Sequence, residues 1–170
     1  MGHNNNRSVF FPLHCGEILC SITGHFFVQW QRVWRESCVS QRKGLFLLGI
    51  KNEITQESVV DTGNRRTDCL IHRMRIGHVP LNYYLYRLGL VDSDQCSYCG
   101  TEETLEHYLM ECDQFFDERS RMFISIFYII GYPPRLSLKL LLGGGEFSAA
   151  RNKLIVRALA TYIRNSRRFS

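Results

Sequence analysis

Four residues in this chain have the types and spacing needed to bind a metal ion: Cys96, Cys99, His107 and Cys112. Their arrangement is C-x2-C-x7-H-x4-C. Three thiolates and one imidazole make a closed tetrahedral set, which a structural zinc ion prefers. Because protein donors take all four positions, none stays open for water or substrate. The spacing therefore predicts a structural Zn²⁺ site, not a catalytic one.

The residues around these ligands indicate how the chain positions them. Gly100 can adopt a positive φ, which lets backbone N–H groups point at the sulfur atoms. Thr101 is expected to cap a helix that carries acidic residues in its first turn. In a regular helix, at about 100° per residue, Cys112 lies about 140° off the face of His107. We therefore predict that the helix ends near residues 110–111 and that Cys112 turns back to the metal.

Two other interpretations of these cysteines stay open. A redox Cys-x-x-Cys pair would lie at a helix N-terminus after a strand, where one thiol pKa is lowered. The preceding segment, residues 89–94, is too short and polar to be a good strand. The redox interpretation also gives no reason for the metal-ligand spacing of His107 and Cys112. The second alternative is a set of unrelated buried cysteines. The other cysteines have no regular framework, so we expect free thiols at Cys15, Cys20, Cys38 and Cys69.

Charge is distributed unevenly along the chain, whose net charge is +5. Residues 91–118 contain nine acidic residues and no Lys or Arg, whereas residues 119–170 contain ten basic residues and one acid. The metal segment is therefore an acidic island, and any nucleic-acid surface should lie on its basic flanks. Arginine suits bidentate phosphate contact better than lysine does. The candidate nucleic-acid-binding residues are Arg66, Arg73, Arg75, Arg87, Arg157 and Arg164.

The apolar pattern predicts a mainly α protein, a small helical domain organised around one Cys3His zinc knuckle with little or no β-structure. We divide it into a weakly ordered N-terminal segment, a basic helical segment, the zinc knuckle and basic C-terminal helices, over residues 1–24, 25–90, 91–113 and 114–170. Helices are expected over residues 26–36, 65–77, 81–88, 114–130, 136–142 and 147–165. Residues 45–50 can form either a strand or a buried turn.

Side-chain positions follow from the helical spacing. The apolar residues of the first helix are expected in the core: Phe26, Trp30, Val33 and Trp34. In the helix over residues 65–77, Leu70, Ile71 and Met74 should face inward, with Arg66, Arg73 and Arg75 outside. The last helix is expected to bury Leu154, Ala158, Leu159, Tyr162 and Ile163.

Two further segments carry weaker signals. Residues 143–145 are three glycines without the lysine and Ser/Thr of a phosphate-binding P-loop, so we interpret them as a flexible linker. Arg164, Arg167 and Arg168 form a basic tail that is either solvated or in contact with phosphate.

No stretch of the sequence reaches transmembrane length without a polar break. His14, Gly16 and Glu17 interrupt the N-terminal apolar stretch, so no convincing signal peptide is present. We therefore expect no membrane partner and an intracellular location, in the nucleus or cytoplasm.

An ordered string of motifs covers residues 73–112: RMRIGH at 73–78, PLN at 80–82, LYRLGL at 85–90, CSYCG at 96–100 and ETLEHYLMEC at 103–112. It resembles the C-terminal zinc-knuckle (CCHC) region of non-LTR retrotransposon reverse transcriptases, downstream of the polymerase and ribonuclease H domains. The resemblance implies zinc ligation by the same four residues and engagement of RNA or DNA. The rest of a reverse transcriptase polyprotein is a further candidate partner.

The catalytic motifs of that family are missing from this chain. It has no Tyr-x-Asp-Asp style pair for a polymerase and no acidic cluster for a ribonuclease H. We therefore expect a non-enzymatic, zinc-stabilised nucleic-acid-binding fragment. The alternative is a zinc-stabilised structural or protein-interaction module whose acidic island docks a basic partner.

Overall fold

The computed structural model describes residues 15–42, 44–51, 53 and 58–169, with side chains from residue 23 onward. These residues are mostly helical and form no sheet, which confirms the predicted fold class. The expectation for residues 1–24 lies largely outside the described part. The α-helices are α1 (Cys15–Ser40), α2 (Leu45–Ile50), α3 (Arg65–Arg75), α4 (Asn82–Arg87), α5 (Phe116–Ile130), α6 (Leu138–Leu141) and α7 (Ala149–Ser166). None of the described helices is both long and apolar enough to cross a membrane.

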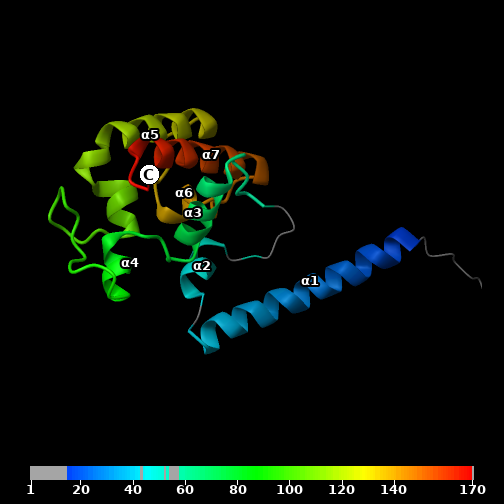
Figure 1. Ribbon diagram of the computed structural model, residues 1–170. Helices are drawn as coiled ribbons and strands as arrows, with labels where there is room; N and C mark the ends of the chain where they lie inside the picture. Colours follow the sequence, from blue (N-terminus) through cyan, green and yellow to red (C-terminus); the bar gives the residue numbers. More distant parts are fainter. Residues whose placement is uncertain (1–14, 43, 52, 54–57, 170) are drawn as a thin grey trace, which may run out of the picture.

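Helices α5 and α7 lie side by side and form the centre of the molecule, with α3 and α6 also packed against α7 (Figure 1). Their facing side chains are fully buried, including Ile126 of α5 and Ile155 and Leu159 of α7. Leu154, which we expected inside, is 46% exposed, so that prediction is wrong. Helices α3, α5 and α6 all pack against α7, and the face that they cover is centred on Ile155 and Leu159.

Residues 45–50 form helix α2, so neither the predicted strand nor the turn is correct. Short apolar runs do not distinguish a strand from a buried helix by periodicity. Gly44 precedes this helix with a φ of 72°, a conformation that glycine adopts without strain.

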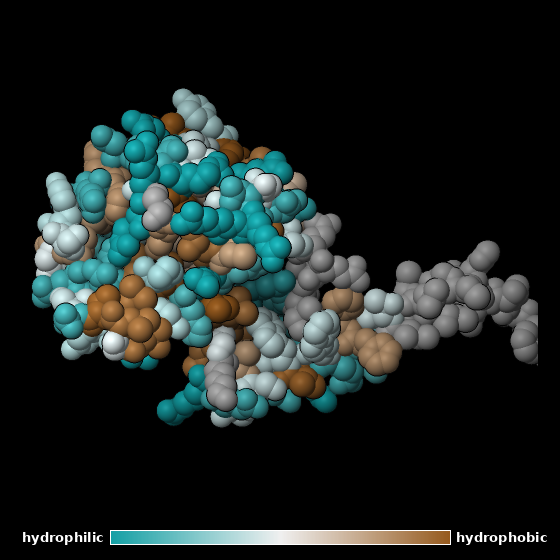
Figure 2. Space-filling view, in the orientation of Figure 1, coloured by the Kyte–Doolittle hydropathy of each residue, from teal (hydrophilic) through white to brown (hydrophobic). Residues whose placement is uncertain are grey.

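Helix α1 projects away from the rest of the molecule and contacts mainly α2 (Figure 1). The prediction that its apolar residues form core is therefore wrong for Phe26, Trp30 and Val33, which are 67%, 60% and 52% exposed. Hydrophobic side chains are visible at intervals along this helix in Figure 2. The spacing correctly indicates a helix, but spacing alone does not say which element covers its apolar face.

Helix α3 follows its predicted pattern at most positions. Asn64 caps it by accepting a hydrogen bond from the backbone N–H of Thr67. Ile71 and Met74 are fully buried, as expected. Arg75, which we placed on the outside, is only 7% exposed, so that placement is wrong. The helix is enclosed on a second side by α2, and this contact between distant segments covers the arginine.

The three glycines at residues 143–145 form a packed turn between α6 and α7, so the linker prediction is wrong. Gly143 is buried with a φ of 75°. The N–H groups of Gly143 and Gly144 donate to carbonyls of α6, at 3.1 and 2.8 Å. A Cβ atom on Gly144 would overlap the carbonyl oxygen of Ile50. Gly144 is needed because the backbone there lies directly against the end of α2.

We predict that Gly144→Ala lowers the free energy of unfolding by about 1–3 kcal/mol, because the added methyl group forces α2 away from the turn. Gly49→Ala is the matched control, since a Cβ there meets nothing within 4 Å. The control should leave stability unchanged or raise it by up to about 1 kcal/mol, as alanine favours helix. Urea unfolding measures both variants, and equal stabilities would contradict the packing argument.

Candidate metal centre

The first two candidate ligands lie in a tight loop. An isolated β-bridge joins Gln95 to Glu102, and the N–H of Cys96 donates to the carbonyl of Thr101 at 2.7 Å. Gly100 closes the turn with a φ of 71° and donates to the carbonyl of Cys96 at 2.9 Å. The predicted positive φ is therefore confirmed. The loop does not place Cys96 and Cys99 at a helix N-terminus, which the redox interpretation requires.

The other two candidate ligands lie at the ends of the π-helix η1 (His107–Glu111): His107 is its first residue, and Cys112 follows its last. The helical segment starts at Leu105, and Thr104 caps it by accepting from the N–H of His107 at 3.0 Å. The predicted cap at Thr101 is therefore wrong by three residues. The N–H of Cys112 donates to the carbonyl of His107 at 2.8 Å, an i→i+5 bond. This wider turn brings a residue five positions later back toward the histidine.

The end of this helix matches the sequence prediction. The backbone leaves helical geometry at Cys112, with φ −55° and ψ 119°, so the expected stop after Glu111 is confirmed. A 3-10 turn, η2 (Asp113–Phe115), follows and leads into α5. No side chain caps that turn.

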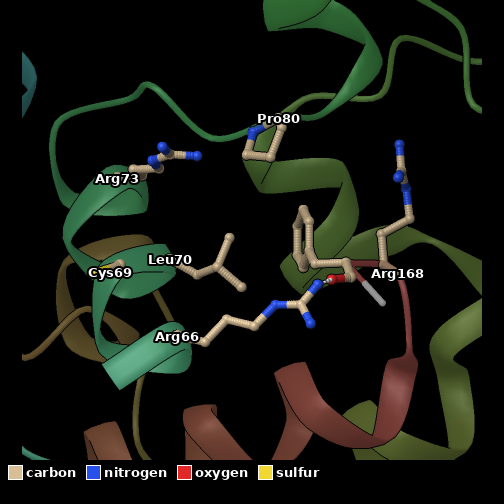
Figure 3. Close-up of a pocket in the computed structure, with 7 residues that line it drawn as sticks. Arg66, Cys69, Leu70, Arg73, Pro80 and Arg168 are labelled. Carbon is tan, nitrogen blue, oxygen red and sulfur yellow. Dashed lines mark hydrogen bonds between the residues drawn. The ribbon is translucent and has the colours of Figure 1, made fainter. Parts of the chain in front are cut away.

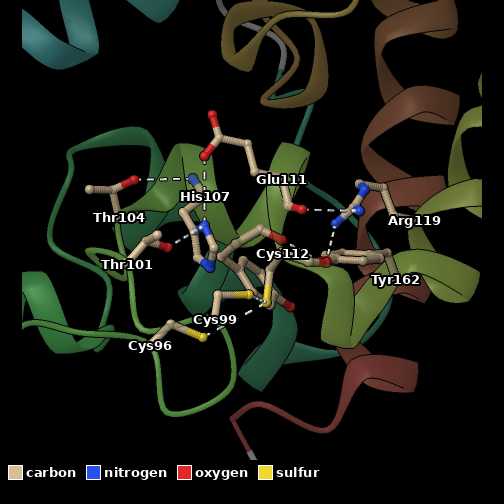
Figure 4. A network of polar contacts seen from close by, with 10 residues as sticks. Cys96, Cys99, Thr101, Thr104, His107, Glu111, Cys112, Arg119 and Tyr162 are labelled. Atoms are coloured by element: carbon tan, nitrogen blue, oxygen red, sulfur yellow. Dashed lines mark hydrogen bonds and ion pairs between the residues drawn. The ribbon is translucent and has the colours of Figure 1, made fainter.

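The structure brings the four predicted ligands together, with all donor atoms within 4.8 Å of one another (Figure 4). The sulfur of Cys112 lies 3.8 Å from that of Cys96 and 3.6 Å from that of Cys99. A disulfide needs about 2.05 Å, so these sulfurs are contacting thiols. The group is mostly buried and can hold a metal ion.

The histidine ring is oriented for ligation through one nitrogen. Nε2 of His107 is buried without a hydrogen-bond partner in the described chain, so it is the nitrogen free to bind an ion. Nδ1 lies 3.3 Å from the hydroxyl of Thr101 and 3.6 Å from a carboxylate oxygen of Glu111. A carboxylate behind the ring is a common support for a metal-binding histidine, because it favours the proton on Nδ1.

The two buried thiols have different acidities. Burial opposes ionisation of Cys96, but the N–H groups of Cys99 and Tyr98, followed by side-chain contacts, lower its pKa to about 7. Burial, followed by the contact with Cys99, raises the pKa of Cys112 to about 12. The clustered thiols cannot all ionise without a nearby cation. A divalent ion binding here must therefore displace protons.

Two residues that the sequence analysis did not connect with the metal site support η1 from behind. Arg119 of α5 is buried and donates to the carbonyl oxygens of Cys112, at 2.6 Å, and Glu111, at 3.4 Å. The hydroxyl of Tyr162 in α7 donates to the carbonyl of Tyr108 at 2.5 Å. These bonds satisfy carbonyls that a helix end would leave free. Figure 4 shows both side chains reaching the turn from neighbouring helices.

A partly buried ion pair joins the segment that carries the candidate ligands (residues 91–113, the metal loop) to the C-terminal segment. Arg168 donates through Nε and Nη2 to the two carboxylate oxygens of Glu103, both at 2.6 Å. Glu103 is 4% exposed and also accepts the backbone N–H of Asn82, at 2.8 Å. We had expected the acidic residues of this segment to form an exposed acidic surface. Glu103 is buried and therefore does not contribute to one. Arg168 is 27% exposed and is held by this ion pair, so it is not the freely solvated tail residue that was one of our two predictions.

The candidate nucleic-acid-binding arginines separate into two groups. Five are exposed: Arg66, Arg73, Arg87, Arg157 and Arg164. The sixth, Arg75, is buried beside α2 and does not share a surface with them. Of the exposed group, Arg66 donates to the carbonyl of Phe169 at 2.7 Å, and Arg87 lies over the ring of Tyr83.

The remaining cysteines agree with the expectation of free thiols where they are described. Cys38 is buried, Cys69 is exposed, and neither is in a disulfide. The side chains of Cys15 and Cys20 lie outside the described part of the chain.

The chain matches no protein-family model, no curated protein and no solved structure.

We predict that Glu103→Gln lowers the free energy of unfolding by about 2–4 kcal/mol, because it removes the charge that compensates Arg168. Glu102→Gln is the neighbouring control, since Glu102 is exposed, and it should change stability by less than about 0.5 kcal/mol. Chemical denaturation of the two variants gives the comparison. Similar losses in both would mean that the ion pair contributes nothing specific.

Proposed function

We propose that this chain is a non-catalytic, zinc-stabilised module that binds RNA or DNA through arginines outside the metal loop. The proposal extends the sequence resemblance to the C-terminal region of non-LTR retrotransposon reverse transcriptases. Its main support is the convergence of three thiols and one imidazole nitrogen within 4.8 Å.

Zinc is the ion that this donor set fits best. Thiolate and imidazole ligands in tetrahedral geometry favour Zn²⁺ over the oxygen-seeking ions. Tetrahedral Zn–S bonds of about 2.3 Å place two sulfurs about 3.8 Å apart. The separations of 3.8 and 3.6 Å from Cys112 to its two neighbours are close to that value. Four protein donors leave no position for substrate, so the ion would hold the fold.

We predict that Cys99→Ser lowers metal affinity strongly and unfolds at least residues 91–113. Structural zinc can contribute about 10–16 kcal/mol in small domains, which is comparable to the net stability of a whole domain. Native mass spectrometry with and without chelator reports the metal and its stoichiometry, and hydrogen exchange reports residues 91–113. Cys69→Ser, at an exposed thiol away from the site, is the control and should behave as the parent. A melt that neither Cys99→Ser nor chelator changes would refute the structural role.

Exposed arginines without acidic partners support phosphate binding. Arg32, Arg121 and Arg168 each form an ion pair with a glutamate. Arg73, Arg87, Arg157 and Arg164 make no such pair within the described residues, so their charge is available to a ligand. Arginine guanidinium groups bind phosphate through paired hydrogen bonds.

A cleft concentrates part of this charge. It has a volume of about 450 Å³ and lies between α3 and the C-terminal segment (Figure 3). Arg66 and Arg73 line it from α3, opposite Arg168, with Leu70 and Phe169 supplying apolar surface. Because Arg66 and Arg168 already bind groups of the protein, Arg73 is the most available of the three.

We predict that two double variants, Arg73→Ala with Arg87→Ala and Arg157→Ala with Arg164→Ala, weaken binding to single-stranded RNA and DNA. Each lost phosphate contact should reduce the dependence of log affinity on log salt by about 0.7. Fluorescence anisotropy over a salt series measures both quantities. The matched control is Arg32→Ala with Arg121→Ala, which removes two exposed arginines already paired with glutamates. The proposal fails if all three double variants bind like the parent.

A second candidate function is protein binding, which one surface feature favours. Leu88 and Leu90, just after α4, are 53% and 67% exposed, and Tyr86 is 50% exposed. Figure 2 shows a hydrophobic patch at this end of α4. Binding through such a patch would depend weakly on salt, whereas phosphate binding weakens steeply as salt rises. The salt series therefore separates the two functions.

A further inference from the structure

A second cationic site lies away from the metal centre, in a cavity of about 960 Å³. Lys51, at the end of α2, and His72 and Arg75, of α3, line one side of it. The glycine turn at residues 143–145 and the first turn of α7 line the other side. Distant parts of the chain therefore bring three basic side chains to one concave surface.

Arg75 is the unusual group in this cavity. Its side chain is only 7% exposed, and its Nε is buried without a hydrogen-bond partner. The guanidinium makes no hydrogen bond or ion pair with any residue in the described part of the chain. Leaving a buried charge without a partner is costly, so proteins normally pair it or bind a counterion there. Nothing in the described fold supplies that counterion.

The neighbouring groups make the charge imbalance larger. Burial and then the charge of Arg75 lower the pKa of Lys51 and, despite an opposing effect of Asp68, that of His72. Glu53 also lines the cavity, but it is exposed and forms no ion pair with these cations among the described residues. Lys51 and Arg75 thus repel each other across a space that an anion can enter, while the lowered pKa of His72 keeps it a neutral imidazole near pH 7, able to donate a hydrogen bond to that anion.

The opposite wall also suits an anion. Helix α7 has 18 residues, and its N-terminal turn, which includes Ala149, faces the cavity. The N-terminus of a helix carries partial positive charge and backbone N–H donors. Asn152 of the same turn keeps a buried side-chain oxygen without a partner, so a hydrogen-bond donor on the ligand has an acceptor there.

We infer that this cavity is a binding site for a phosphate group, with Arg75 at its base and Lys51, His72 and the N-terminus of α7 around the anion. The volume exceeds what inorganic phosphate needs and is within the range of small-molecule sites, so a phosphorylated molecule of about nucleotide size fits. A phosphate of a nucleic-acid chain has the same chemistry. The site does not rest on the proposed function, because it lies apart from the exposed arginines and the metal ligands.

The test compares the parent protein with Arg75→Met in buffers of equal ionic strength, with chloride or with millimolar inorganic phosphate. Phosphate should raise the Tm of the parent by about 3 °C or more at saturation, and the rise should disappear in Arg75→Met. Phosphate can also stabilise a folded protein without binding, because it is excluded from the protein surface. Any rise in Tm that remains in Arg75→Met measures this general effect. Arg121→Met, at an exposed arginine that is already paired with Glu118, is the matched control and should keep the full rise.

The Tm measured without phosphate is a second readout of the unpaired charge on Arg75. Without phosphate, Arg75→Met should melt at or above the Tm of the parent, because it removes an uncompensated buried charge. A clearly lower Tm would show that the protein itself satisfies the guanidinium, and the inference would be overturned. Arg75→Lys keeps the charge but not the paired donors, so its phosphate affinity should fall by about tenfold with the fold intact. The inference is also overturned if phosphate shifts the parent and Arg75→Met equally, or shifts neither.

Calorimetric titrations with inorganic phosphate, adenosine monophosphate and a short single-stranded oligonucleotide identify the source of the phosphate group. Tighter, Arg75-dependent binding of the monophosphate assigns a small molecule, whereas tighter binding of the oligonucleotide assigns a nucleic-acid backbone. Oligonucleotide binding that depends on the exposed arginines but not on Arg75 belongs to the proposed function alone. Phosphate binding that survives loss of the exposed arginines supports the cavity independently.

Discussion

The π-helical turn over His107–Glu111 is the constraint on which the candidate metal centre depends. A regular α-helix places residues five positions apart on different faces, so His107 and Cys112 could not bind one ion from it. The i→i+5 bond between them widens the turn and removes that obstacle. Such turns are rare and often functional, and this one is held by Arg119 from α5 and Tyr162 from α7.

This support makes the metal loop part of the main fold, not a separate appendage. Helices α5 and α7 form the core and also supply the side chains that hold the turn. From the other side, Glu103 joins the loop to the start of α4 and, through Arg168, to the end of the chain. The arrangement of the three thiols is therefore connected to the packing of the helical body.

Arginines serve different purposes here that the sequence does not distinguish. Arg119 donates a hydrogen bond to the backbone carbonyl of Cys112, and Arg168 forms an ion pair with Glu103. Arg73 and Arg157, in contrast, are exposed to solvent. Arg75 belongs to neither class, because it is buried without a described partner. Local spacing places a residue on a helix face, but whether that face meets solvent depends on segments that arrive later in the chain.

The sequence by itself determined the helical class, most helix ranges and the four residues that form the donor cluster. These follow from local signals: hydrophobic spacing, glycine and proline breaks, and the types of side chain that bind metals. Only the tertiary structure decided that the apolar face of α1 is exposed, that residues 143–145 are a packed turn, and that Arg75 and Glu103 are buried. Burial is set by contacts between segments far apart in the chain, and no local pattern encodes those contacts.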